Sequence, residues 1–369
     1  MKSSTYYSNT IETLVWPESL GDHPAVVRAR TALTRAKRIE IPDPADGIWE
    51  PPAELANPST LVVQKPKSRM FGRCPGTHGH LCCNYLTVDL YVGCTIGCSY
   101  CIMQSYLRNR TLVVQIDDGE SVEHIRRTAE RNGDRLIRVG TGEVGDSLLF
   151  DPLFDLSRRY IEELADLSNV RFELKTKTDY VDHLLPVEKK GNAVIAFSLN
   201  PQSIIDREEG FAASLEDRLA AAERAGRAGY GVAFHFDPMI AIDGWKEAYG
   251  DILSRLERFR GGDVAWISLG TLRFPPSLHP FLLNTSYIGH EFVRSRDGKM
   301  RYLQPVRAGM YRFMRDELDR RLPGTAVYLC MESTPVWRNV YHGASVDQRK
   351  ATQPVMQPVT IRDVVGVER

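Results

Sequence analysis

Residues 87–101 read TVDLYVGCTIGCSYC, an apolar stretch that runs directly into a loop with three cysteines. The apolar part, residues 87–92, predicts a strand. The loop places Cys94, Cys98 and Cys101 in a C-x3-C-x2-C spacing, and three thiolates so spaced can hold three corners of a cubane iron–sulfur cluster. A structural zinc site would need four ligands, usually on two paired C-x2-C arms, and a fourth cysteine at a fitting distance is missing. A cluster held in this way keeps one iron open for chemistry.

The chain beyond this loop alternates apolar stretches with amphipathic ones. Strands are expected at residues 87–92, 135–139, 171–176, 193–198, 231–236 and 264–269, and a last edge strand at 326–330. Helices are expected at residues 121–129, 152–167, 216–228, 245–258 and 308–321. This order predicts an α/β fold, a partial six-unit βα barrel of the TIM type, whose parallel sheet is covered by helices. Chemistry in such a fold lies at the carboxyl ends of the strands.

The N-terminal region predicts a smaller βαβ unit. A strand is expected at residues 13–16, a helix at 24–36 with Asp22 as its cap, and a second strand at 38–41. Prolines are dense over residues 42–58, which is typical of a linker or an extended wrap. We therefore expect three parts: a small unit with its linker (1–60), the barrel (61–340) and a C-terminal tail (341–369).

Composition sets the broad class of protein. The 369 residues are 43% hydrophobic and 25% charged, which excludes a mostly disordered chain. Lys and Arg number 47 and Asp and Glu number 47, so global charge gives no reason to expect nucleic-acid or membrane binding. No uncharged apolar run approaches about 18 residues, and the N-terminus lacks a signal core, so the expected location is the cytoplasm. Six of the seven cysteines lie between residues 74 and 101, which suggests metal or redox chemistry.

The cysteine loop resembles that of the radical S-adenosylmethionine (SAM) superfamily, including Tyr100 just before the third cysteine. As an ordered set, further stretches resemble the spore photoproduct lyase family: residues 74–83, 180–185, 197–200, 244–245, 330–333 and Trp337. The resemblance implies a [4Fe–4S] cluster whose open iron binds the amine and carboxylate of SAM. Reduction by one electron then cleaves SAM to methionine and a 5′-deoxyadenosyl radical, which abstracts hydrogen. It also implies a reductant such as flavodoxin or ferredoxin and, as substrate, a lesion in DNA.

Polar residues at the predicted strand ends are the candidates for SAM binding. Gly142 and Glu143 follow the second barrel strand, where a glycine lets the backbone approach a ligand and a carboxylate can pair with the SAM ammonium. The resemblance implies that Lys177, after the third strand, contacts the SAM carboxylate or ribose. It implies polar SAM contacts for Ser198 and Asn200, at the end of the fourth strand. Each could instead be an ordinary strand-end polar residue.

Weaker candidates lie further along the chain. His235 and Asp237 end the fifth strand and Arg273 follows the sixth, where they could act in catalysis or contact substrate; a hydrogen-bonded core histidine with a nearby carboxylate is the alternative. Residues 294–321 carry nine Lys or Arg against four acids, with Tyr302 and other aromatics interleaved. This segment could contact phosphates and stack a base, or form the solvated face of a helix. The cysteines outside the triad, Cys74, Cys82, Cys83 and Cys330, could be reactive, metal-binding or simply buried.

The sequence departs from the family at two positions. Spore photoproduct lyases have a cysteine just after the second barrel strand that returns a hydrogen atom to the product, and Gly140-Thr141-Gly142 stands there instead. At the position of the family tyrosine after the third cysteine stands Ile102, and the candidate substitute donors are Cys330 or a tyrosine in the cavity. We therefore expect radical formation but poor spore photoproduct lyase activity. Two alternatives remain: a radical SAM enzyme for a small metabolite or peptide, and a non-enzymatic iron–sulfur or zinc-binding module.

Overall fold

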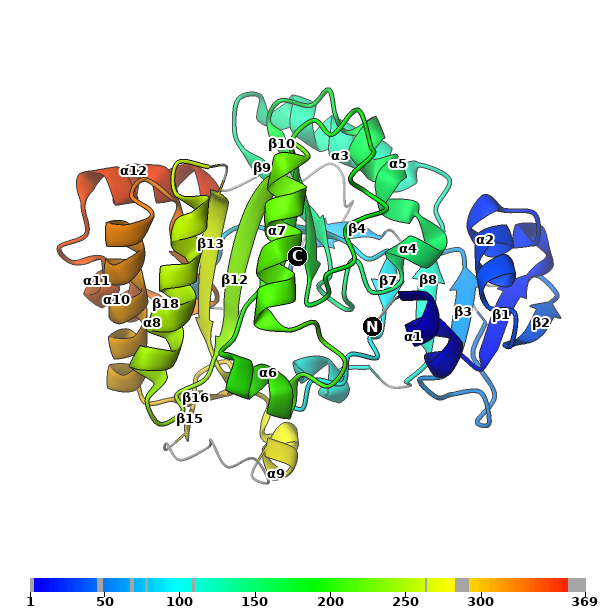
Figure 1. The fold of residues 1–369 in the computed structure, drawn as a ribbon, viewed down its shortest axis with the longest axis horizontal. Helices are drawn as coiled ribbons and strands as arrows, with labels where there is room; N and C mark the ends of the chain where they lie inside the picture. Colours follow the sequence, from blue (N-terminus) through cyan, green and yellow to red (C-terminus); the bar gives the residue numbers. More distant parts are fainter. Residues whose placement is uncertain are drawn as a thin grey trace.

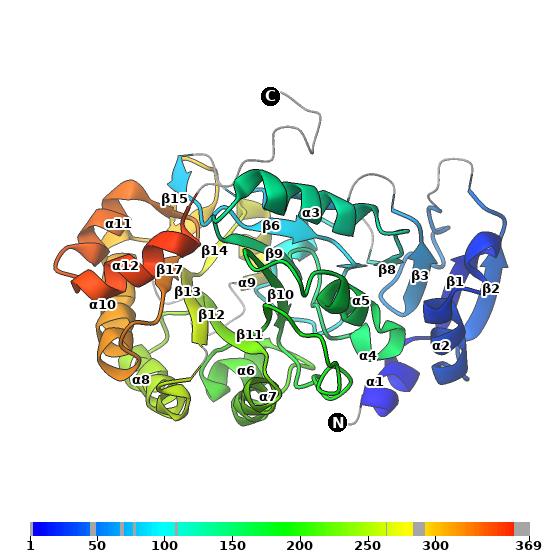
Figure 2. The same ribbon diagram turned by 90° about the horizontal axis from the view of Figure 1, so that it is seen from above.

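The computed structural model describes residues 3–44, 49–66, 70–76, 79–107, 110–262, 264–282 and 292–357. Its main sheet has eight strands in the order β17-β13-β12-β11-β10-β9-β6-β4. Their bounds are β4 (Phe71–Arg73), β6 (Leu86–Val88), β9 (Ile137–Thr141), β10 (Val170–Thr176), β11 (Ala193–Ser198), β12 (Gly231–Met239), β13 (Val264–Thr271) and β17 (Val327–Leu329). All neighbours are parallel except β4 and β6, which are antiparallel. The sheet curls into the expected partial barrel (Figure 2).

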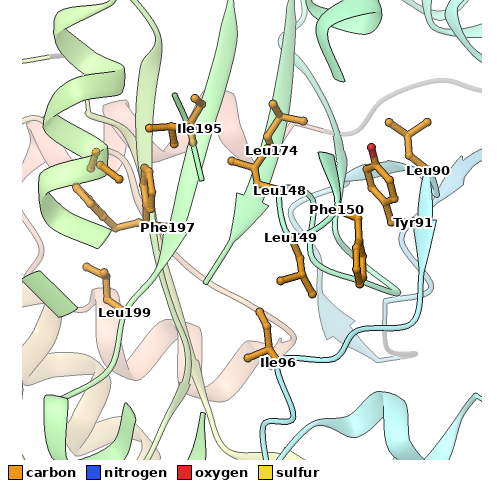
Figure 3. Close-up of a cluster of buried hydrophobic side chains, with 14 of the residues drawn as sticks. Leu90, Tyr91, Ile96, Leu148, Leu149, Phe150, Leu174, Ile195, Phe197 and Leu199 are labelled. Atoms are coloured by element: carbon orange, nitrogen blue, oxygen red, sulfur yellow. The ribbon is translucent and has the colours of Figure 1, made fainter. Parts of the chain in front are cut away.

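Helices cover the outer face of the curled sheet (Figures 1 and 2). They are α3 (Glu120–Asn132), α4 (Asp151–Phe154), α5 (Leu156–Glu163), α6 (Gln202–Glu208), α7 (Leu215–Arg227), α8 (Trp245–Arg255), α10 (Gln304–Arg321) and α11 (Thr334–Tyr341). Ile195 and Phe197 of β11 belong to the buried cluster in Figure 3, where Leu148, Leu149 and Ile96 also lie. Ile96 belongs to the cysteine loop, so the same core that holds the sheet also holds this loop. Among the described residues, no helix is both long and apolar enough to cross a membrane.

The inner face of the sheet combines a small apolar cluster, which includes Ala196, Ala233 and Trp266, with several charged side chains. Arg138 on β9 and His235 on β12 both contact Glu173, which lies between them on β10. Lys175, two residues further along β10, interacts with Asp237 of β12. Because side chains alternate across a strand, these residues share one face while their apolar neighbours pack outward against the helices. The charges of the barrel therefore lie inside it.

The expected N-terminal βαβ unit is present as part of a larger sheet. β1 (Thr13–Pro17) and β2 (Lys37–Ile41) are parallel and joined by α2 (Pro24–Ala32). The full order is β2-β1-β3-β8-β7, where the added strands are β3 (Thr60–Gln64), β8 (Leu112–Gln115) and β7 (Tyr91–Val92). A short helix, α1 (Ser3–Thr10), precedes it. The small sheet thus continues past residue 60, where we expected a boundary, and the three-part division of the chain stays a prediction.

Several predicted elements differ in detail. The strand expected at residues 87–92 is divided, because the chain leaves the main sheet after β6 and enters the small sheet at β7. The helix expected at residues 152–167 is two helices, α4 and α5, separated at Asp155, whose backbone is left-handed with φ 57°. α2 ends at Ala32 rather than at residue 36, and its cap is His23, whose side chain accepts a hydrogen bond from the Ala25 amide, not Asp22.

The C-terminal segment is more ordered than a tail. It contains α12 (Val346–Val355), and the Thr352 hydroxyl donates a 3.0 Å hydrogen bond to the carbonyl of Val327 on β17. Val355 and Met356 pack with Trp266 and Tyr328 of the main sheet. α12 therefore covers the β17 edge, and the residues of the expected tail from 358 onward lie outside the described residues.

Candidate functional site

The cysteine loop lies at the carboxyl end of the main sheet, next to α6 (cyan beside α6 in Figure 1). Its backbone is bound to the segment that follows α6: the Ser99 amide donates to the Glu208 carbonyl at 2.9 Å, and the Phe211 amide donates to the Ile96 carbonyl at 2.9 Å. A Cβ atom at Gly210 would come within 2.2 Å of the Ile96 carbonyl oxygen. Glycine at position 210 is therefore what lets the loop approach this closely.

A buried polar network supports the loop from behind. The Tyr100 hydroxyl donates to the carboxylate of Glu209, and the Asn200 amide donates to the same carboxylate at 3.0 Å. Arg218 donates to Glu209 at 2.5 Å and to the Ser198 carbonyl at 2.7 Å. Burial would raise the pKa of Glu209, but the charges of Arg218 and Lys177 and the hydrogen bonds hold it at about 2. The carboxylate therefore stays ionised and binds all its partners at neutral pH.

The triad fits a cluster better than a single ion. The thiols of Cys94, Cys98 and Cys101 interact electrostatically, and burial raises the pKa of Cys98 to about 12. Thiolates on one zinc ion would lie about 4 Å apart, given Zn–S bonds near 2.3 Å. Among the described residues, only Asp151, Asp155 and His183 form a group of such ligand atoms within 4.8 Å of one another. The wider cysteine spacing suits a cubane, in which each thiolate binds a different iron.

Gly142 and Glu143 form the turn after β9. Gly142 has φ 88°, and a Cβ there would lie 2.7 Å from the Ser147 hydroxyl and 3.0 Å from the Lys175 carbonyl, so the position requires glycine. The Glu143 carboxylate lies 3.9 Å from the Lys175 ammonium and 3.8 Å from the Cys74 thiol. Its side chain is 25% exposed, which leaves part of the carboxylate open to a ligand.

The structure places Lys177 beside the triad. The Lys177 ammonium lies 5.9 Å from the Tyr100 ring centroid and interacts electrostatically with Cys98. Ser198 ends β11 and is buried near Asn200. Asn200 donates to Glu209 and Tyr100 and accepts from Tyr249 at 3.0 Å, so its side chain positions the loop. The predicted SAM contacts of all three residues stay predictions.

Sequence reasoning missed the residues that hold these elements together. Asp146 accepts hydrogen bonds from the amides of Leu148 and Leu149, from the Thr176 hydroxyl and, at 2.7 Å, from the Lys177 amide. It thereby joins the turn after β9 to the end of β10. Glu209 and Arg218 were missed as well. A pair of acids before a glycine, Glu208-Glu209-Gly210, was the only available hint, because the partners lie far apart in the sequence.

The weaker candidates at the inner face are paired with one another. His235 Nε2 lies 2.5 Å from Glu173 Oε1 and the histidine is 8% exposed, the arrangement of a hydrogen-bonded core histidine. Asp237 accepts two hydrogen bonds from Arg273, at 2.9 and 3.1 Å. Arg273 Nη2 also lies 3.6 Å from the Cys330 sulfur. The structure thus brings Asp237, Arg273 and Cys330 together, and their predicted roles remain untested.

Tyr302 does not suit its predicted contact with substrate. It is fully buried, its hydroxyl accepts from the Ala241 amide at 3.1 Å, and its ring centroid lies 4.5 Å from that of Phe292. The sequence shows only that Tyr302 stands among basic residues. It does not show whether the ring faces solvent or the core, and this is why the predicted substrate contact does not fit the structure.

The basic segment is largely paired within the protein. On α10, Arg307 contacts Glu332, Arg315 donates to the Val340 carbonyl, and Arg321 contacts Glu317. The exposed arginines of this segment are Arg294 and Arg296, on the hairpin of β15 (Phe292–Arg294) and β16 (Met300–Tyr302), and Arg312 and Arg320 on α10. If this segment binds phosphates, both the hairpin and the helix offer exposed positive charge.

Replacing Glu209 by Gln is expected to lower the free energy of unfolding at pH 7 by about 3–5 kcal/mol, because Arg218 would stay buried with no anionic partner. The folded pKa of Glu209, about 2, lies below its ordinary value of 4.5. Its stabilising contribution is therefore complete above about pH 4.5 and disappears as pH falls toward 2. Denaturant unfolding followed by circular dichroism at pH 7 and pH 3 measures this. The exposed Glu130→Gln is the control, and a difference between Glu209→Gln and wild type that is equal at both pH values would contradict the assignment.

Comparisons with known proteins agree on one family. A family model described as spore photoproduct lyase matches residues 59–264. Spore photoproduct lyase of Bacillus subtilis (strain 168) is 27% identical over 209 residues, which cover 56% of this chain and 59% of that protein. Spore photoproduct lyase of Geobacillus sp. (strain Y412MC61) is 26% identical over 195 residues, 53% of this chain and 56% of that protein. The matches thus span a little over half the length of these relatives.

Solved structures extend the likeness of fold to most of the chain. A spore photoproduct lyase complexed with dinucleoside spore photoproduct superposes with a TM-score of 0.72 at 21% identity, covering 86% of this chain and 98% of that one. A variant of that enzyme with bound AdoMet and the same dinucleoside gives a TM-score of 0.71. Together with the family match over more than half of the sequence, these findings show that the chain belongs to the spore photoproduct lyase family.

Proposed function

We propose that this protein is a radical SAM enzyme whose cluster is held by Cys94, Cys98 and Cys101. When bound, the cluster and SAM supply reductive cleavage of SAM and a 5′-deoxyadenosyl radical that abstracts hydrogen from the substrate. The observation that carries the proposal is the firm attachment of the cysteine loop to the residues after α6, with Lys177 beside it at the same end of the sheet. A cluster needs this kind of rigid support for its thiolates.

The chain's own residues bind and orient SAM in this proposal. Glu143 is partly exposed in the turn after β9, and its carboxylate pairs with the SAM ammonium. Gly142, where a Cβ atom would be too close to neighbouring atoms, lets the backbone approach the ligand. Lys177, held at its amide by Asp146, pairs with the SAM carboxylate or ribose. Ser198 adds a polar contact at the end of β11. A one-electron reductant such as flavodoxin or ferredoxin supplies the electron.

The substrate class that we propose is a lesion in nucleic acid. The structural neighbour is described with a dinucleoside photoproduct, and two exposed arginines, Arg294 and Arg296, lie on the β15–β16 hairpin, which follows the sixth strand of the barrel. A small metabolite or peptide remains the second candidate for the same cofactors. A zinc-binding module is less favoured because the triad sulfurs are too far apart for one ion.

Replacing Glu143 by Gln is expected to weaken SAM binding by roughly ten- to a hundred-fold, because a charge-assisted hydrogen bond to the ammonium contributes about 1.5–3 kcal/mol. Isothermal titration of the anaerobically reconstituted enzyme with SAM measures the affinity, and iron content should stay at the wild-type level. The exposed Glu188→Gln is the matched control. Unchanged affinity in Glu143→Gln would make Glu143 a turn residue without a role in SAM recognition.

We expect poor repair of spore photoproduct itself. No thiol follows β9, where residues 140–142 are Gly-Thr-Gly, and Ile102 begins the short helix after the triad. The test is conversion of a synthetic spore photoproduct dinucleotide and of lesion-bearing DNA, at several salt concentrations, with SAM cleavage measured in parallel. SAM cleavage with little thymine formed is the expected result. Multiple-turnover conversion to thymine would refute it and would require a hydrogen donor elsewhere in the barrel.

A further inference from the structure

A run of basic residues lies in the small N-terminal unit, outside the site described above. Residues 28–38 read RARTALTRAKR, which is five Lys or Arg with no Asp or Glu among them. Arg28 pairs with Asp155 at 3.3 Å, and the other four form no ion pair among the described residues. We call these four the α2–β2 basic patch: Arg30, Arg35, Lys37 and Arg38.

The local structure directs the charged groups of the patch away from the core. α2 packs its apolar face into the small unit, and Leu33 and Ala36 are buried in the connection from α2 to β2. Arg35, between these two anchors, is exposed. Lys37 and Arg38 are exposed at the start of β2, which is the edge strand of the small sheet. The alternation of apolar and basic residues therefore places the positive charges on the surface.

Two of the four side chains are held in place. Arg30 Nη1 donates to the Gly21 carbonyl at 3.3 Å, and the Arg30 guanidinium carbon lies 5.2 Å from the centroid of the Trp16 ring. Arg38 Nη2 donates to the Arg30 carbonyl at 2.8 Å. All these partners are neutral groups, so the contacts orient the two guanidinium groups without neutralising their charge.

The dipole of α2 does not account for the patch. Cations in the last turn of a helix interact favourably with its free carbonyl groups. Only Arg30 is in the last turn of α2, which ends at Ala32, whereas Arg35, Lys37 and Arg38 come after it. Like charges gathered without acids repel one another, and this repulsion lowers the free energy of unfolding unless an anion binds. The patch therefore suits a partner with several negative charges.

The surroundings of the patch favour a nucleic acid over a membrane surface. A helix that lies in a membrane surface exposes an apolar face beside its basic one. The apolar face of α2 is buried in the unit, and within the described residues 3–44 only one large apolar side chain, that of Val27, is exposed. Arg and Lys side chains without an apolar surround are typical of contacts to phosphodiester groups.

The patch is attached to the end of the barrel at which the candidate site lies. α2 packs against α4, and Arg28 of α2 contacts Asp155, the residue directly after α4 (Figures 1 and 2). α4 begins at Asp151, shortly after Leu149, whose amide donates to Asp146 in the turn after β9. A nucleic acid that enters the barrel at this end has the small unit beside it.

We propose that the α2–β2 basic patch binds the phosphate backbone of the nucleic-acid substrate outside the lesion. This inference rests on the proposed function, because it assigns to the small unit the part of the substrate that does not react. Contacts to phosphates fix the position of a nucleic acid and release its counterions, which adds affinity without reading sequence. A dinucleotide in the barrel is too short to gain this affinity.

The test removes three charges of the patch, in the variant Arg35→Gln, Lys37→Gln and Arg38→Gln. Arg30 is kept because it packs on Trp16. Fluorescence anisotropy measures binding to duplex DNA of about 20 base pairs, and to a single strand of equal length, at about 50 to 200 mM salt. The slope of log K against log salt is expected to fall by about 3, since each lost phosphate contact lowers it by about 1.

A matched control removes the same charge from arginines that are paired with Glu123, Glu163 and Asp251. This control variant is Arg127→Gln, Arg159→Gln and Arg255→Gln, and it should keep the wild-type slope. Cleavage of SAM in the presence of a dinucleotide should be equal in the patch variant and wild type. Circular dichroism verifies the fold of both variants.

An unchanged slope in the patch variant, or an equal decrease in the control, would overturn the proposal. It would also be overturned if wild type bound neither DNA at low salt, and binding to phosphatidylserine vesicles instead would assign the patch to a membrane surface. Failure of the proposed function has a different signature. Wild type would then bind DNA with the patch-dependent slope and form no 5′-deoxyadenosine.

Discussion

The buried ion pair between Glu209 and Arg218 is the contact on which the rest of the site depends. The Glu209 carboxylate accepts hydrogen bonds from Tyr100 of the cysteine loop and from Asn200, which follows β11. Arg218 also donates a hydrogen bond to the Ser198 carbonyl. Both charges are completely buried. Removing either one would leave the other buried without a partner, which would strongly lower the free energy of unfolding. One pair therefore fixes the loop against the strand that ends beneath it. On the other side, the Tyr6 hydroxyl of α1 lies 2.5 Å from the Thr95 hydroxyl and covers the loop.

The sheet has an outer face that packs against helices and an inner face that carries ion pairs, and the candidate site lies on the inner face. Its outer face packs apolar side chains such as Phe197 and Phe234 against helices, which gives rigidity. Its inner face carries ion pairs, from Arg138 and Glu173 near the amino ends of the strands to Asp237 and Arg273 near the carboxyl ends. A low-dielectric interior strengthens such interactions and makes any unpaired group costly. The inner face is accordingly where a charged cofactor finds fixed partners.

Much of this could be predicted because it follows from local pattern. The strand expected at residues 193–198 has those bounds in the structure, since a fully buried apolar run is unambiguous in that context. Glu143 and Lys177 follow predicted parallel strands, whose carboxyl ends meet at one edge, and the family resemblance implied the SAM contact of Lys177; the SAM contacts of both residues stay predictions. The triad was found from spacing alone.

The rest depends on contacts between residues distant in sequence. Nothing near Asp146 indicates that it binds the Lys177 amide, and nothing near Leu81 indicates that Glu332 lies opposite. The divided strand at residues 87–92 has the same origin, because the move from one sheet to another is a property of the whole fold. Tyr302 shows the converse: its neighbours suggested a surface role, and tertiary packing placed it in the core.

The central claim is that the cysteine loop supports reductive cleavage of SAM. Anaerobically reconstituted wild-type protein, incubated with SAM and a one-electron reductant, should form 5′-deoxyadenosine and methionine in equal amounts. Cys98→Ala should form neither, because the loss of one of three thiolates leaves an incomplete cluster site. Equal 5′-deoxyadenosine from wild type and Cys98→Ala, or none from wild type with iron bound at the triad, would contradict the account.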